Sequence, residues 1–128
     1  MNSFLINIAL VACGGAFGAT LRYLIGIGVI SFFGKGFPFA TLSVNILGSL
    51  IMGTIFQLVQ QETIPASPWW PLIGVGFLGA LTTFSTFSMD NLLLLQQGEL
   101  FKAMLNIVLN VVVCLLAAYA GTLLVIKS

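Results

Sequence analysis

The sequence is poor in charge and contains no histidine. Only 5% of its 128 residues are charged, whereas 59% are hydrophobic, and the mean hydropathy is +1.17. Soluble domains carry roughly 25% charged residues, which keep their surface hydrated, so a soluble enzyme or nucleic-acid-binding protein is excluded. The net charge of +1 provides no field that would attract nucleic acid. We therefore expect an integral membrane protein whose main solvent is the lipid bilayer.

The lack of histidine also limits the chemistry of the chain. Its acidic residues are Glu62, Asp90 and Glu99, and one aspartate without a histidine builds neither a serine–histidine nor a paired-aspartate catalytic site. An intramembrane enzyme is therefore not expected. The two cysteines, Cys13 and Cys114, lie in separate apolar segments, and we expect buried free thiols rather than a disulfide or a metal site.

Long uncharged stretches separate the seven charged residues. A helix needs about 20 apolar residues to cross the hydrocarbon core, and helices are expected because lipid-exposed backbone must satisfy its hydrogen bonds within its own segment. Four windows meet this requirement: residues 4–32, 37–60, 70–95 and 100–126. The linkers between them contain Gly or Pro, and the third is expected at residues 90–102. Residues 1–128 are thus predicted to form a single all-α domain of four transmembrane helices.

The distribution of Lys and Arg gives almost no preference for one orientation in the membrane. With four spans, both termini and the second loop share one side, which carries Lys127. The opposite side carries Lys35 and Lys102, and Arg22 can reach it. Because this bias sets the orientation of membrane proteins, we expect the chain to insert both ways up. Two copies can then pair antiparallel, like the inverted repeats of many transporters, as a homodimer with its two-fold axis in the membrane plane.

The third window combines three glycines with a run of threonine and serine at residues 74–88. These residues form helix poorly, so the third helix is expected to break in mid-membrane between Gly79 and Thr83. Carbonyls freed by a break are tolerated only inside protein or beside water, and without an acid nearby they suit a monovalent cation. Phe84 and Phe87 are three residues apart and share a helical face. Their positively polarised ring edges can contact an anion, although ordinary packing also explains them.

Other polar residues in the spans also fall on helical faces. Thr41 and Asn45 are four residues apart, as are Asn106 and Asn110 in the last window. The asparagine side chains can alternatively have a purely structural role, in which they join helices by hydrogen bonds. Arg22 can snorkel to the interface or face an aqueous vestibule and concentrate anions there. Hydroxyls, amides and ring edges without a buried acid suit a small anion, which they bind weakly enough to release.

Three motifs resemble the Fluc (CrcB) family of fluoride channels. They are Gly-Gly-x-x-Gly-Ala-x-x-Arg-Tyr at residues 14–23, Thr-Leu-x-Val-Asn at 41–45, and Gly-x-Leu-Gly-x-Leu-Thr-Thr-Phe-Ser-Thr-Phe-Ser at 76–88. The length and the four-span layout are similar over the whole chain. The resemblance implies a fluoride-selective, passive anion channel in the bacterial inner membrane that exports fluoride from the cytoplasm. It also implies a dual-topology antiparallel homodimer with two pores.

The resemblance also implies roles for individual residues. It places the backbone carbonyls of Gly79 and Thr82, from both subunits, around a structural Na⁺ at the centre of the dimer. Together with the polar faces described above, it gives an anion pathway formed by Arg22, Thr41, Asn45, Phe84, Ser85, Thr86, Phe87, Asn106 and Asn110. The last helix departs from the family, since homologues can show Tyr, Ser and Thr where this chain has Asn and Cys.

A proton-coupled exporter of the small multidrug type is the alternative function. Such carriers are also short, four-spanning and sometimes dual-topology. They need an ionisable group deep in the membrane, whereas here Glu62 is expected in a loop and Asp90 near the end of a span. A non-conducting assembly subunit is a further alternative, and the broken polar third helix argues against it. The expected partners are therefore fluoride, the lipid bilayer and a second copy of the chain.

Overall fold

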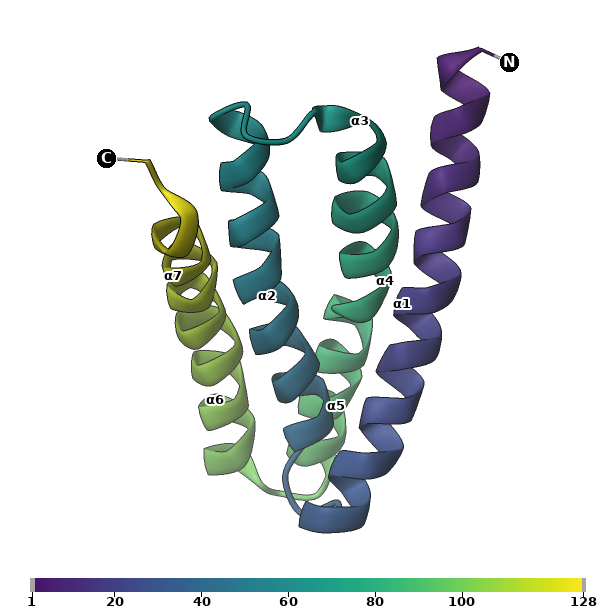
Figure 1. Ribbon diagram of the computed structural model, residues 1–128. Helices are drawn as coiled ribbons and strands as arrows, with labels where there is room; N and C mark the ends of the chain where they lie inside the picture. The colour runs from purple at the N-terminus through teal and green to yellow at the C-terminus, as the bar shows by residue number, and fades with distance from the viewer. Residues whose placement is uncertain (1, 128) are drawn as a thin grey trace.

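A computed structural model describes residues 2–127, which form helices joined by short connections (Figure 1). Four helical segments are long and apolar enough to cross a membrane: Ser3–Phe33, Phe39–Gln60, Ala66–Gln96 and Leu100–Val125. The predicted all-α architecture with four spanning helices is thus confirmed. Both chain ends and the second connection lie at one end of the bundle, and the first and third connections lie at the other (Figure 1).

The first span is one long helix, α1 (Ser3–Phe33), with a defined cap at each end. At its start, Oδ1 of Asn2 accepts a hydrogen bond of 3.1 Å from the N–H of Leu5, the usual role of an N-cap asparagine. At its end, Gly34 has a φ of 74°, which glycine adopts without steric cost. The Gly34 N–H donates to the Ile30 carbonyl over 2.8 Å, so the chain leaves the helix at this residue.

Glycines set the spacing between neighbouring helices. A Cβ added to Gly14 or Gly18 of α1 would collide with backbone atoms of residues 72–77 in the third span, and one added to Gly76 would meet the Val11 carbonyl. The second span, α2 (Phe39–Gln60), packs in the same way against α7 (Cys114–Val125), because Gly53 lies against the Ala118 carbonyl. Small residues at these contacts let the backbones approach closely, as is common in membrane bundles.

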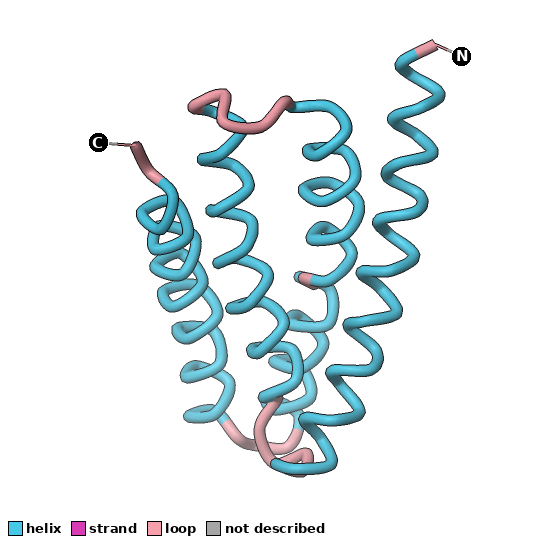
Figure 2. Tube along the Cα trace, in the orientation of Figure 1, coloured by secondary structure: helices cyan, strands magenta, loops and turns pink. Residues whose placement is uncertain are grey.

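The third span is interrupted in the middle, as predicted. It consists of α3 (Ala66–Trp69), the π-helical η1 (Trp70–Leu78) and the short α4 (Gly79–Leu81), and it resumes as α5 (Phe84–Gln96). Thr82 and Thr83 between these parts have extended backbone, with ψ of 155° and 120°. Figure 2 shows the interruption as a loop segment at mid-height in the bundle. The buried side chains of Val44, Leu78 and Leu81 form the core beside it.

Two sequence-based expectations need correction. Residues 90–102 were expected to form the third linker, but α5 continues to Gln96, and the connection to α6 (Leu100–Val108) is confined to residues 97–99. The apolar run at 92–95 extends the helix, so Asp90 lies within it. Cys13 is exposed rather than buried, because α1 packs through the neighbouring face that carries Gly14 and Gly18. Both cysteines are free thiols, and Cys114 is half-buried, at the start of α7 after η2 (Leu109–Val113).

Candidate functional site

Asn45 on α2 bonds to the backbone of the helix break. Its Oδ1 accepts a hydrogen bond of 2.9 Å from the Thr83 N–H, and its Nδ2 donates to the Thr83 carbonyl over 3.3 Å. The same Nδ2 donates to Oδ1 of Asn110 on the fourth span over 2.9 Å. Backbone groups released from a helix inside a membrane need such partners. Asn45 therefore replaces the helical hydrogen bond that the Thr83 N–H loses at the break, and it adds a donor to the Thr83 carbonyl.

Thr83 caps the helix that follows the break. Its Oγ1 accepts from the Thr86 N–H over 3.2 Å and donates to the Thr86 hydroxyl, also over 3.2 Å. It lies 3.3 Å from the Ser85 hydroxyl as well. A threonine N-cap of this kind satisfies one of the unpaired N–H groups of the first helical turn. Ser85 and Thr86, both predicted pathway residues, thus form a group of hydroxyls with Thr83 at the start of α5.

The break also removes the usual helical partners of several carbonyl oxygens, among them those of Gly79 and Thr82. In a continuous α-helix, the Gly79 carbonyl would accept from the Thr83 N–H and the Thr82 carbonyl from the Thr86 N–H. Here the first of these N–H groups donates to Asn45 and the second to the Thr83 hydroxyl. Gly79 and Thr82 are the two residues predicted to hold a cation. Their carbonyls have lost their helical donors, which fits an ion ligated by neutral oxygens.

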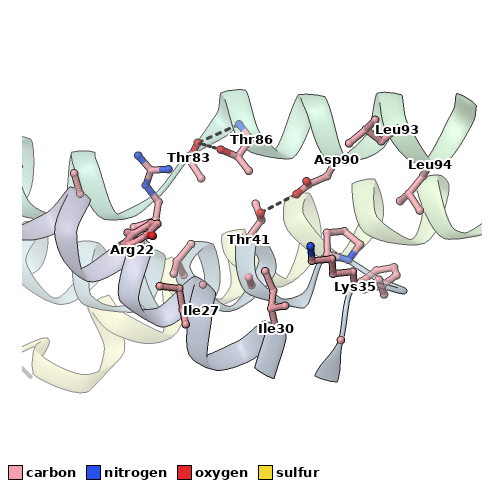
Figure 3. Close-up of a pocket in the computed structure, with 18 of the residues that line it drawn as sticks. Arg22, Ile27, Ile30, Lys35, Thr41, Thr83, Thr86, Asp90, Leu93 and Leu94 are labelled. Carbon is pink, nitrogen blue, oxygen red and sulfur yellow. Dashed lines mark hydrogen bonds between the residues drawn. The ribbon is translucent and has the colours of Figure 1, made fainter. Parts of the chain in front are cut away.

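A cavity of 680 Å³ opens beside the break, between α1, α2 and α5 (Figure 3). Arg22, Lys35, Thr41, Thr86 and Asp90 are among its lining residues. Nε of Arg22 donates to the Ala80 carbonyl over 3.0 Å, so this side chain reaches the break. The Thr41 hydroxyl donates to Oδ2 of Asp90 over 2.7 Å (Figure 3). Arg22 and Lys35 give this cavity two positive groups against one acid, which favours the approach of anions.

A second cavity, of 330 Å³, lies on the other side of the break. Its lining includes Asn45, Thr83, Phe84, Phe87 and Asn110. The two phenylalanine rings are 5.4 Å apart between centroids and tilted by 51°. Phe87 is 9% exposed, whereas Phe84 is 78% exposed on the single chain. Thr83 lines both cavities, so the helix break lies between them.

Asn106, a predicted pathway residue, lines neither of the two cavities. It is fully buried behind Asn110, accepts a hydrogen bond of 2.9 Å from Nδ2 of Asn110 and donates one of 2.9 Å to Oδ1 of Asn91. Neither Asn91 nor Ser49, which lines the smaller cavity, was among the predicted site residues. Asn91 was detectable as an amide next to a run of four leucines. For Ser49, the only feature of the sequence that pointed to the site was its position one helical turn after Asn45.

Fold and site together define a small multi-pass membrane transport protein. A spanning helix broken near its middle, with its freed backbone groups beside cavities that polar side chains help to line, is the usual construction of an ion or substrate site. The family described as CrcB-like protein, Camphor Resistance (CrcB), matches residues 9–122. The chain belongs to this family, and it is a multi-pass protein of the inner membrane.

Relatives match this chain over almost its whole length. A protein from Pseudoalteromonas translucida is 58% identical over 119 residues, which cover 93% of this chain and 99% of the relative. One from Photobacterium profundum is 52% identical over 128 residues, all of both chains. One from Aliivibrio salmonicida is 56% identical over 121 residues, 94% of this chain and 95% of the relative. All three are named fluoride-specific ion channel FluC, which describes ion channels and not enzymes.

Proposed function

We propose that the chain is a passive, fluoride-selective channel. The names of the relatives reported above support fluoride as the transported ion, and the geometry of the site supports passive conduction. The carrying observation is the position of Thr83, which lines both cavities while Asn45 bonds to its backbone. A small anion crossing this point meets hydroxyls and the ring edges of Phe84 and Phe87, groups that replace its hydration without a strong charge.

The proposed direction of transport is export from the cytoplasm. In acidic surroundings fluoride crosses membranes as neutral HF and dissociates inside the cell. A pore that lets the anion run down its gradient then suffices, without coupling to another ion. Arg22 and Lys35 at the larger cavity would raise the local anion concentration at one mouth of the pathway.

We also propose that the channel is an antiparallel, dual-topology homodimer with two pores. Phe84 is largely exposed on the single chain, although it lies next to the break and against Phe87. A second copy would cover this ring and complete the wall of the smaller cavity. Each chain carries one set of pathway residues, so a two-fold pair would carry two pathways. The nearly even distribution of Lys and Arg between the two sides supports insertion in both orientations.

A sodium ion at the centre of this dimer is the proposed cofactor. The carbonyls of Gly79 and Thr82 would hold it, since their helical donors bond elsewhere, and Gly79 is exposed on the single chain. Bound there, the ion would supply positive charge that holds the two breaks together. Replacing Na⁺ by N-methyl-D-glucamine should weaken the dimer in detergent, as measured by cross-linking. An unchanged dimer in sodium-free buffer would contradict the sodium site.

The alternative, a proton-coupled exporter, makes a different prediction in liposomes. A passive channel should release fluoride at the same rate with and without an imposed proton gradient. An exporter should instead drive uptake of an organic cation such as ethidium when the lumen is acidic, and should release no fluoride. Proton-independent fluoride efflux supports the channel. Proton-driven ethidium transport without fluoride efflux would overturn it.

A further inference from the structure

Four asparagine side chains form a chain of hydrogen bonds that starts at the helix break. The Thr83 N–H donates to Oδ1 of Asn45, whose Nδ2 donates to Oδ1 of Asn110. Nδ2 of Asn110 donates to Oδ1 of Asn106, whose Nδ2 donates to Oδ1 of Asn91. All four distances are 2.9 Å. Every bond runs in the same sense, so the amide dipoles are aligned and each strengthens the next.

The two amides at the smaller cavity have no spare donor in this arrangement. A side-chain amide has two N–H groups. Those of Asn45 point to the Thr83 carbonyl and to Asn110. Those of Asn110 point to the backbone carbonyl and to Oδ1 of Asn106. The amides thus hold one another and the break, and they offer no free N–H to an ion in the cavity.

The chain of amides returns to the helix on which it began. Asn91 lies on α5, two turns beyond Thr83 at the start of that helix. Phe84, Phe87 and Asn91 are spaced by three and four residues, so they share one helical face. The bonds at Thr83 and at Asn91 therefore fix both ends of the face that presents the two rings. Rotation of α5 about its axis would break the chain at Asn91, where Asn106 is fully buried and its amide needs a partner.

We propose that Asn91 and Asn106 are positioning residues of the ion pathway. Through Asn110 and Asn45 they fix the conformation of the break and the rotation of α5, without touching the ion. This inference rests on the proposed channel function, because fluoride efflux is one of its two readouts. The other readout, hydrogen exchange of the Thr83 N–H, measures the hydrogen bond at the break directly and needs no ion.

The test compares variants at the far end of the chain with a matched control. Asn91→Leu leaves the buried Asn106 amide without its acceptor. The double variant Asn91→Leu/Asn106→Leu removes both partners of this buried bond and leaves one N–H of Asn110 unpaired, but at the lining of the smaller cavity. It serves if the single variant fails to fold, because it leaves no polar side chain buried at positions 91 and 106. The control is Thr54→Val, which removes a hydrogen bond of 3.2 Å between α2 and the Gly121 carbonyl of α7, away from the break.

In both asparagine variants we expect exchange at Thr83 to rise about fivefold, the factor for one weakened buried hydrogen bond. Fluoride efflux should fall about tenfold because the rings are displaced, and the control should show neither change. Unchanged exchange at Thr83 in a folded variant, or unchanged efflux despite faster exchange, would overturn the proposal. An unmodified protein that releases no fluoride would overturn the channel function alone, since the exchange rates still measure the chain of amides.

Discussion

At the scale of single residues, the two phenylalanines beside the break differ sharply in environment. Phe87 is packed inside the chain, whereas Phe84 is 78% exposed, although their centroids are only 5.4 Å apart. An exposed ring next to a polar break has little to contribute to the stability of the single chain. Its position at the smaller cavity fits contact between its ring edge and an anion.

The first prediction concerns this ring. Phe84→Ile should lower fluoride efflux from liposomes by about tenfold or more, because isoleucine has no positively polarised edge. Dimer assembly in cross-linking experiments should be unchanged. Phe101→Ile is the matched control, since Phe101 is 77% exposed and lies on α6, away from the cavities. Equal efflux from both variants would remove Phe84 from the mechanism.

The polar residues of the site were predictable from the sequence, but not all of their partners were. Asn45, Phe84 and Phe87 stand out because their spacing places them on helical faces within apolar segments. The pairing of Asn91 with Asn106 depends on which helices face each other. Helical periodicity shows on which face of its helix a residue lies, but it does not show which other helix packs against that face. The same limitation applies to Arg22, because only the fold shows that its Nε reaches the Ala80 carbonyl.

At the scale of the elements, the break depends on one side chain from another helix. Asn45 bonds to both the N–H and the carbonyl of Thr83. Asn45→Leu would leave the Thr83 N–H and Oδ1 of Asn110 unpaired, whereas the Thr83 carbonyl keeps its helical hydrogen bond as the N-cap of α5. We expect a loss of about 2–3 kcal/mol in the free energy of unfolding, measured by denaturation in detergent with helical circular dichroism as the signal. Thr54→Val should cost less than half as much, and an equal loss in both variants would contradict the special role of Asn45.

Close packing of α1 against the third span leads to a prediction of its own. In Gly18→Ala, the new methyl group would collide with the Phe77 carbonyl and approach Cβ of Ala80. Backbone atoms cannot move aside cheaply, so stability should fall by about 1–3 kcal/mol. Gly26→Ala on the same helix is the control, because no atom lies within 4 Å of its added Cβ. The thermal midpoint in detergent measures both, and equal midpoints would show that this packing is looser than described.

The break and its place between Gly79 and Thr83 were predictable from the glycines and hydroxyl residues of the third window, but the residues at which the helix opens were not. Gly79 keeps helical dihedrals, with φ of −61° and ψ of −33°, and the interruption falls at Thr82 and Thr83. Asn45 and the Thr83 hydroxyl compete there for the backbone N–H groups, a tertiary effect that local propensity does not contain. The π-helical stretch Trp70–Leu78 also had no counterpart in the sequence pattern.

At the level of the whole molecule, Gly79, Phe84 and Ser85 beside the break are exposed on the single chain, and the charges barely distinguish the two sides of the membrane. Both features follow if two copies associate in opposite orientations. The prediction is tested with a single cysteine, Ser3→Cys, in a background carrying Cys13→Ala and Cys114→Ala. About half of the molecules should be labelled by an impermeant reagent added outside intact cells or spheroplasts. Labelling of all molecules, or of none until the membrane is opened, would contradict dual topology.

In the proposed channel, the interrupted third span forms the wall of a selective route for fluoride. The most direct measurement is ion release from liposomes that contain the purified protein together with both fluoride and chloride, each followed by its own electrode. We expect rapid fluoride release without an imposed proton gradient, little release of chloride, and loss of the fluoride signal in Phe84→Ile. Equal release of the two halides, or no fluoride release from the unmodified protein, would contradict it.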